Sequence, residues 1–264
     1  MIQIALALFA FFAGSPFALG APLHDAARDG DLEKARALIA EGAAIDAQSD
    51  RGETPLILAT LAGQREVVEL LIEHGAAIDV RNEGGFTPLH AAAYAGDAAI
   101  AELLIAKGAD INDAQNKAGV TPLFVAAEED HRVMAELLIE QGAAIDGRNV
   151  GGFTPLHAAA YAGDAAMAEV LIAKGADIND TQNKAGVTPL FPAIEEDHKE
   201  LTELLLARGA DPGLMERAGY TPLTRALFKG HQDVVVSLIE HGAECQTADV
   251  LGKALHEACL AAGK

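Results

Sequence analysis

Hydrophobic residues recur along this chain in short helical groups separated by polar turns. In the segment that begins at Thr87, the Thr hydroxyl is a suitable helix cap, and Pro88 occupies the first helical position, where its missing N–H costs nothing. An apolar run then continues to Tyr94 and stops at Gly96. Further on, apolar residues spaced three and four apart lie on one face of a helix. The pattern predicts a short helix from Pro88 through Tyr94 and a second helix over residues 97–106.

This pattern repeats at a fixed period. Thr-Pro-Leu begins at Thr54, Thr87, Thr121, Thr154, Thr188 and Thr221. Degenerate copies begin at Ala21 and Lys253, so seven repeats and the first half of an eighth follow residue 20. The period predicts an all-α repeat solenoid with a capping repeat over 21–53, six full repeats over 54–252 and a half-repeat cap over 253–264.

Each pair of helices is followed by a loop that contains a glycine two residues before the next Thr-Pro-Leu. These glycines are Gly52, Gly85, Gly119, Gly152, Gly186 and Gly219. A turn that always uses Gly favours a backbone conformation with positive φ, which Gly adopts without steric cost.

The repeated motifs resemble those of the ankyrin-repeat family. Thr-Pro-Leu-His-Ala-Ala-Ala-Tyr-Ala-Gly-Asp begins at Thr87 and again at Thr154, and Lys-Gly-Ala-Asp-Ile-Asn-Asp begins at Lys107 and again at Lys174. The resemblance covers residues 21–262. It implies paired antiparallel helices, β-hairpin loops at one edge, and a protein-binding surface made of hairpin tips and inner helices. Phe124 and Phe191 replace the motif's His, and Pro192 falls one turn into a helix, which are departures from the family pattern.

The first twenty residues differ from the rest. No charged residue occurs from Ile2 to Leu19, and the apolar stretch from Ile4 to Ala13 has the length of a secretory h-region. Small residues at Ala18 and Gly20 fit a cleavage site, so we expect residues 1–20 to be a signal peptide cleaved after Gly20. An uncleaved anchor and a misassigned start are the alternatives. Cleavage predicts an exported protein, periplasmic or secreted, with no stable membrane span in the mature chain.

Composition limits the classes of partner and agrees with thin repeats. Half of the residues are hydrophobic but only 5% are aromatic, and Trp is absent. Such a chain favours small helices packed closely over one thick core. The net charge of −20 disfavours nucleic acid as a partner, because phosphate binding needs a basic surface.

The aromatic residues form two series spaced by 67 residues: Phe86, Phe153, Tyr220 and Tyr94, Tyr161, Phe228. The resemblance places both series on the concave groove. Residues 84–124 and 151–191 differ at three of 41 aligned positions, which indicates duplication. A row of exposed aromatics is a candidate binding surface. The alternatives are that each aromatic covers a neighbouring loop or that duplication copied a neutral residue.

Acidic residues occupy the matching place in the intervening repeats. Glu128, Glu129 and Asp130, and likewise Glu195, Glu196 and Asp197, replace the usual turn at the ends of the first helices. One interpretation is a site for calcium or for a cationic partner; the other is a solvated turn. Calcium needs oxygens that converge on one point, and consecutive acids at a helix end diverge, so the geometry favours the turn.

The sequence predicts no catalytic residues and no cofactor or metal. His24, His90, His157 and His256 recur at the fourth position of the motif, where a structural hydrogen bond to the adjacent loop is the expected role. No nucleophile elbow, P-loop or zinc motif occurs, and the uniform spacing leaves no insertion for a catalytic pocket.

Cys245 and Cys259 are the two cysteines of the chain. Cys245 takes the apolar position of Ile111 and Ile178 in other repeats, and Cys259 lies on the following inner helix. A disulfide that fastens the end of the array fits export. Two small apolar fillers are the alternative.

Taken together, these features predict a non-enzymatic module that binds another protein through its concave surface. The expected partner is basic and carries apolar anchors. A self-assembling scaffold and an accessory or protective subunit of an exported enzyme are the alternatives.

Overall fold

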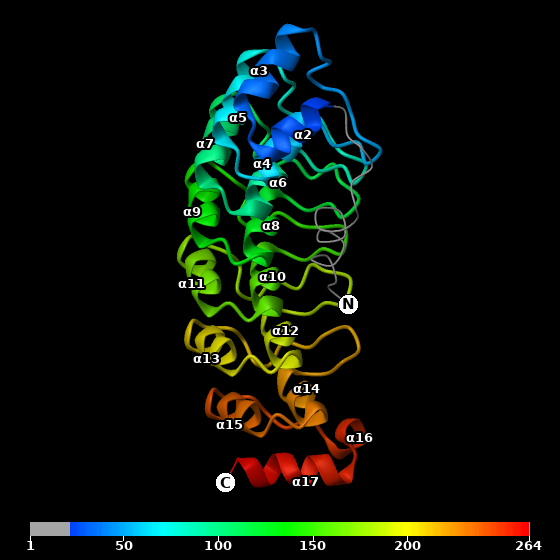
Figure 1. Ribbon diagram of the computed structural model, residues 1–264. Coiled ribbons are helices and arrows are strands. Elements are labelled where there is room, and N and C mark those ends of the chain that lie inside the picture. The colour runs from blue at the N-terminus through cyan, green and yellow to red at the C-terminus, as the bar shows by residue number, and fades with distance from the viewer. Residues whose placement is uncertain (1–21, 264) are drawn as a thin grey trace. The chain divides into compact units, whose positions relative to one another are not determined.

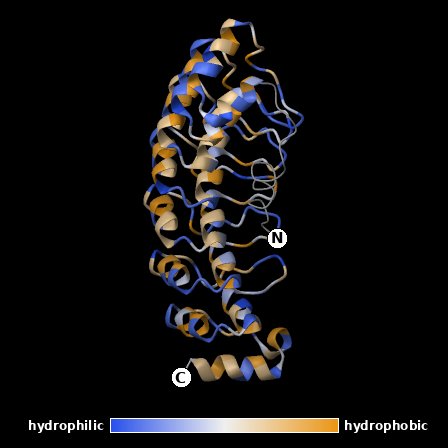
Figure 2. Cartoon of the chain, viewed as in Figure 1, coloured by the Kyte–Doolittle hydropathy of each residue, from blue (hydrophilic) through white to orange (hydrophobic). Residues whose placement is uncertain are grey.

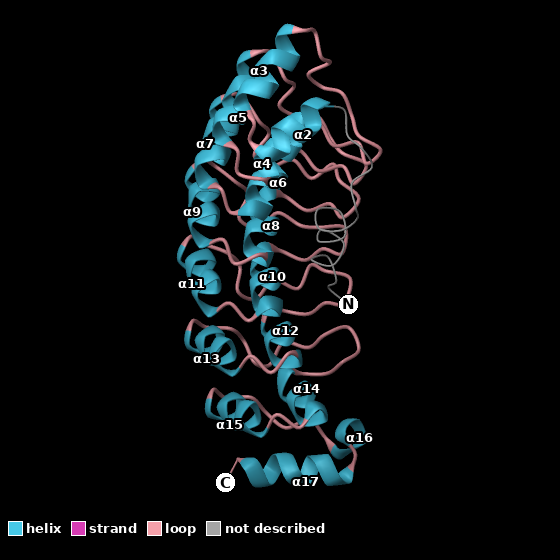
Figure 3. Cartoon of the chain, in the orientation of Figure 1, coloured by secondary structure: helices cyan, strands magenta, loops and turns pink. Residues whose placement is uncertain are grey.

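The computed structural model describes residues 22–263, so the expected signal peptide at residues 1–20 lies outside the described residues. Every regular element in the described range is a helix (Figure 3). The chain divides into two compact units, one ending at Val150 and the other beginning at Gly151. Each unit is described by itself below.

In the first unit, helices alternate between two rows (Figure 1). The inner helices are α2 (Pro22–Asp29), α4 (Pro55–Leu61), α6 (Pro88–Ala95) and α8 (Pro122–Glu128). The outer helices are α3 (Leu32–Ala40), α5 (Arg65–Glu73), α7 (Ala98–Ala106) and α9 (Arg132–Glu140). Successive inner helices pack against one another, and each inner helix also packs against the outer helix that follows it in the chain.

The second unit repeats this arrangement and ends differently. Its inner helices are α10 (Pro155–Ala162), α12 (Leu190–Glu195) and α14 (Pro222–Lys229). Its outer helices are α11 (Ala165–Ala173), α13 (Lys199–Ala207) and α15 (Gln232–Glu240). Its last helix, α17 (Lys253–Ala262), packs against the outer helix α15. A short extra helix, α16 (Ala248–Leu251), forms in the last loop and packs against α17.

The helices start and stop where the sequence predicts. Thr54 precedes α4, and its hydroxyl accepts a hydrogen bond from the Ile57 amide at 3.3 Å. Helix α6 ends at Gly96 with φ of 70°, and the six loop glycines all have positive φ. The Cβ of any other residue at Gly85 would lie 2.5 Å from the Asn116 Cα, so this position requires glycine for space as well as for φ.

The core of each repeat is one thin layer. On α6, Leu89 and the alanines at positions 91–93 are buried. Apolar residues follow the contact faces of the helices (Figure 2). The composition therefore predicted the packing correctly, because alanine-rich faces let helices approach closely.

The loops are hairpin-shaped turns, and no described residue from 22 to 263 is in a regular strand. The Asn82 amide donates to the Phe86 carbonyl at 3.1 Å and closes a turn, while the Glu83 amide donates to the Arg51 carbonyl of the preceding loop at 2.9 Å. These turns correspond to the hairpin loops that the resemblance implies. One backbone–backbone bond between these neighbouring loops falls short of a β-ladder, which needs repeated pairs of such bonds.

Pro192 is accommodated without breaking α12. The helix begins at Leu190, so Pro192 lies in its first turn, where its missing N–H removes no helical hydrogen bond.

Candidate protein-binding surface

The recurring histidines join adjacent repeats, as predicted. The Nε2 atoms of His24, His90 and His157 lie 3.1, 2.9 and 3.0 Å from the carbonyl oxygens of Glu53, Val120 and Val187. His256 contacts the Gln246 carbonyl at 2.8 Å through Nδ1. The imidazoles of His24, His90 and His157 thus each contact a carbonyl of the next loop, which fixes the position of that loop tip relative to the inner helix, whereas His256 contacts the loop before it.

A second set of histidines was not assigned a role from sequence. His131 and His198 lie 2.9 and 3.0 Å, through Nε2, from the carbonyl oxygens of Tyr94 and Tyr161 in the preceding repeat. A Cβ at Gly96 would lie 2.6 Å from the His131 ring. The glycine that ends the inner helix therefore also makes room for this imidazole, so the histidine holds the tyrosine-bearing end of α6 in place.

Phe86 contradicts the expectation of an exposed aromatic row. Only 4% of its surface is exposed, and its ring meets His90 edge-on at 5.6 Å between centroids. The ring also lies over Gly84, where a Cβ would come within 2.8 Å of it. Phe86 thus covers its own loop and helix start, and not the neighbouring loop that the alternative expected. In the second unit, Phe153 meets His157 in the same way at 5.5 Å and is half-buried.

Tyr94 remains partly exposed at the end of α6, and an acidic residue of the next repeat lies near it. Burial, and secondarily the charge of Glu129, raises the pKa of the Tyr94 hydroxyl. Burial also raises the pKa of Glu129, opposed by nearby His131. Glu128 is half-buried beside it. In the first unit, the structure therefore brings aromatic Tyr94 close to acidic Glu129, although the two residues belong to successive repeats.

In the second unit, Tyr220 and Phe228 form a pair. Their rings meet edge-on at 5.3 Å, and Phe228 is 45% exposed. Tyr161, on α10, is half-buried. Two members of the predicted aromatic series therefore make one surface cluster within a single repeat.

Arg225 completes this cluster and was missed from the sequence. It projects from α14, and its guanidinium carbon lies 5.7 Å from the centre of the Tyr220 ring. Its Nε lies 3.4 Å from a carboxylate oxygen of Glu195 on α12, and its Nη2 pairs with Glu216. The sequence does contain a signal for it: Arg225 is a charged residue at a position where the equivalent inner-helix residues are Ala91 and Ala158. We define the aromatic–acidic cluster as Glu195, Glu216, Tyr220, Arg225 and Phe228.

The remaining acids act as turn residues. Asp130 and Asp197 take the place of the helix-ending glycine with φ of 57° and 60°. Glu196 is exposed. Among residues 22–263, no group of three His, Cys, Asp or Glu side chains is arranged to hold a metal ion.

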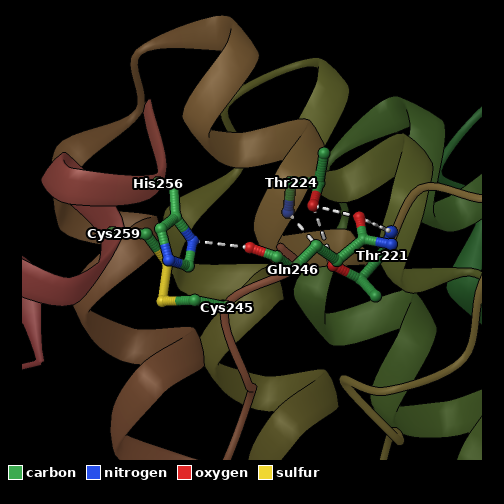
Figure 4. The surroundings of a disulfide bond; sticks show 6 residues. All are labelled: Thr221, Thr224, Cys245, Gln246, His256 and Cys259. Carbon is green, nitrogen blue, oxygen red and sulfur yellow. Dashed lines mark hydrogen bonds between the residues drawn. A yellow bond between two sulfur atoms is a disulfide. The ribbon is translucent and has the colours of Figure 1, made fainter. Parts of the chain in front are cut away.

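Cys245 and Cys259 form a disulfide with 6.0 Å between their Cα atoms (Figure 4). Cys259 on α17 is fully buried, whereas Cys245 is half-buried. Figure 4 also shows Gln246, whose side-chain amide donates to the Gly219 carbonyl at 2.8 Å and whose side-chain oxygen accepts from the Thr221 amide at 3.3 Å. The bridge therefore links α17 to a loop that is itself bonded to the previous repeat.

Within the described part of the chain, no helix has the length and apolar character needed to cross a membrane.

Comparisons with known proteins agree with this architecture. A family model described as ankyrin repeats (3 copies) matches residues 23–115, 112–182 and 180–249. The crystal structure of the human ASB11 ankyrin repeat domain is similar, with 27% sequence identity and a TM-score of 0.76 over 85% of this chain and 99% of that chain. No curated protein matches the chain. The repeat motifs, the paired helices and the family match together show that this chain belongs to the ankyrin-repeat family.

Proposed function

We propose that this protein binds another protein through the exposed part of its inner helices and loop tips, and that it catalyses no reaction. Ankyrin repeats are in general protein–protein interaction modules. The observation that carries the proposal is the aromatic–acidic cluster of the second unit, where Phe228 is 45% exposed beside Tyr220 and Glu195. Aromatic residues in such a position are typical binding anchors.

The chemistry of this surface favours a basic partner with apolar side chains. Glu195 is 42% exposed, and the chain has a net charge of −20. Opposite charge on a partner speeds encounter and orients it, while apolar side chains supply affinity at the aromatic rings. In the first unit, Tyr94 and Glu129 offer the same combination.

The proposal is tested by capturing a partner from the organism's own exported fraction with residues 21–264 as bait. The double variant Tyr220→Ala/Phe228→Ala should capture less of the identified partner than the unsubstituted protein. Val236→Ala is a matched control, because Val236 is 43% exposed on the outer helix α15 of the same unit.

Equal capture by the aromatic variant and the control, with unchanged helical circular dichroism, would refute the proposed surface. A protein that only self-associates in light scattering would support the scaffold alternative. A captured enzyme whose activity survives longer with this protein bound would identify it as an accessory subunit.

We also propose that the chain is exported and cleaved after Gly20. The disulfide between Cys245 and Cys259 supports an oxidising destination, since such bonds persist mainly outside the cytosol. Mass spectrometry of the N-terminal peptide from cells should find Ala21 as the first residue. Recovery of the peptide that contains residues 1–20 in the mature protein would contradict cleavage.

A further inference from the structure

A cleft of about 610 Å³ lies in the second unit between its last two loops. One side is formed by the loop that follows α13, from Asp211 to Met215. The other side is formed by residues from His241 to Val250, and Thr221 also lines the cleft. None of these residues belongs to the aromatic–acidic cluster, although Met215 and Thr221 are next in the chain to Glu216 and Tyr220.

One bond that joins earlier loops is absent from the last pair beside the cleft, although the Gln246 side chain still joins the last loop to Gly219 and Thr221. A side-chain oxygen of one loop accepts from a backbone amide of the next loop in four places: Asp46 from Ala77 at 3.0 Å, Asp79 from Asp110 at 3.4 Å, Asn112 from Ala144 at 2.8 Å and Asn179 from Asp211 at 2.9 Å. In the last pair the equivalent residues are Gly213 and Glu244. Gly213 has no side chain, so it cannot bridge the two loops in this way.

The backbone bond between loop tips also differs at this point. The Arg217 amide donates to the Ala185 carbonyl of the preceding loop at 2.9 Å. In the last loop, the equivalent amide, that of Val250, instead donates to the backbone carbonyl of Thr247 at 3.0 Å, within the turn that forms α16. The chain therefore turns into a helix where earlier loops bond to their neighbours.

The lining combines apolar and acidic side chains. Met215 is 59% exposed and Val250 is 42% exposed, although both are large and apolar. Asp211 and Glu244 are exposed carboxylates, and of the described residues neither Lys nor Arg lines the cleft. Such a surface favours a cation next to an apolar group.

We propose that this cleft binds an extended segment of a partner protein that carries Lys or Arg next to an apolar side chain. The apolar side chain packs against Met215 and Val250, and the cation pairs with Asp211 or Glu244. The Glu244 amide lacks the side-chain acceptor that its equivalents have, so it can donate to a carbonyl of the bound segment. A second copy of this chain is a poorer occupant, because two molecules of charge −20 repel each other.

Gly213→Asn is the most direct test, because Asn occupies the equivalent positions 112 and 179. Gly213 does not have positive φ, and its added Cβ would meet only the movable carboxylate end of Asp211, at 3.1 Å. The variant should restore the bridge to the Glu244 amide and narrow the cleft. Gly213→Ala is the matched control, since it adds a Cβ without an acceptor.

The probe is a short fluorescein-labelled peptide of alternating lysine and leucine, followed by fluorescence anisotropy. Gly213→Asn should weaken its binding about tenfold, and Gly213→Ala should leave it unchanged. Met215→Ser should weaken it as well, and a peptide of alternating glutamate and leucine should not bind.

Unchanged binding by Gly213→Asn and Met215→Ser would overturn the proposal. If Tyr220→Ala/Phe228→Ala abolishes binding while the cleft variants do not, the peptide uses the inner-helix surface, which supports the proposed function and refutes the cleft. A dimer in light scattering that Gly213→Asn dissociates would make a second copy the occupant and would also overturn this inference.

Discussion

At the scale of single residues, His90 shows how one side chain links two repeats. Its Nδ1 accepts from the Thr87 amide at 3.3 Å, and its Nε2 lies 2.9 Å from the Val120 carbonyl, to which it donates. This pair of bonds requires the neutral imidazole. Complete burial lowers the pKa of His90. The Val120 carbonyl and Asp113 oppose this shift, while Arg81 adds to it.

The lowered pKa predicts a dependence of stability on pH. As pH falls, His90 takes up a proton in the unfolded chain at a higher pH than in the folded protein. His90 therefore lowers the free energy of unfolding as pH falls below the ordinary histidine pKa of 6.5. At neutral pH, His90→Gln should lower the free energy of unfolding by about 1–3 kcal/mol, since it disturbs buried hydrogen bonds. Urea unfolding at several pH values should show this difference shrinking toward acid pH. A difference that grows toward acid pH would contradict the neutral imidazole.

Asp130 illustrates a residue in a conformation that suits glycine. Its φ is 57°, which costs about 1–2 kcal/mol for a residue with a Cβ. The contact of its Oδ1 with Nε of exposed Arg132, at 3.4 Å, contributes little. Asp130→Gly should therefore raise the free energy of unfolding by about 1 kcal/mol.

Gly96→Ala is the opposite control for this prediction. Gly96 occupies the equivalent place with φ of 70°, and a Cβ there meets the His131 ring, so the substitution should destabilise the protein. The measurement is the midpoint of urea unfolding. A lower midpoint for Asp130→Gly would show that the Asp side chain contributes more than its backbone conformation costs.

At the scale of elements, we expect the disulfide to matter most for α17, the last helix of the described chain. It has no outer helix after it in the described chain, and it packs against α15 and α16. The bridge spans 14 residues, and closing a loop of that length stabilises the folded state by about 3 kcal/mol.

Removal of this bridge should therefore act locally. Cys245→Ser/Cys259→Ser should speed amide hydrogen exchange in α16 and α17, while α10 and α11 keep their protection, because each repeat is supported chiefly by its neighbours. Hydrogen exchange followed by mass spectrometry makes this comparison. Unchanged exchange in α17 would show that packing alone holds the terminal helix.

The sequence predicts elements better than it predicts exposure. Thr54 and Gly96 mark helix ends by local chemistry, which the chain carries at each repeat, and the role of His90 follows from its periodic recurrence. Phe86 could not be judged in this way, because its burial depends on Gly84 and His90 lying under its ring. The Arg225 cluster and the cleft at Gly213 depend on contacts between different repeats, which a single repeat motif does not encode.

At the scale of the whole molecule, the duplication offers a test of repeat autonomy. Residues 84–124 and 151–191 are nearly identical, so deletion of residues 84–150 places matching side chains at the new junction. We expect a shorter protein with the helical circular dichroism of its remaining repeats and cooperative urea unfolding. Loss of the helical spectrum would show that the array depends on distant repeats.

The central claim is that this acidic ankyrin-repeat protein binds a basic partner protein through its exposed aromatic and acidic residues. The most direct measurement is isothermal titration of the captured partner into the unsubstituted protein and into Tyr220→Ala/Phe228→Ala, each at low and high salt. The account predicts binding that weakens with salt and loses about tenfold or more in affinity in the aromatic variant. Binding of equal affinity in both proteins and at both salt concentrations would contradict it.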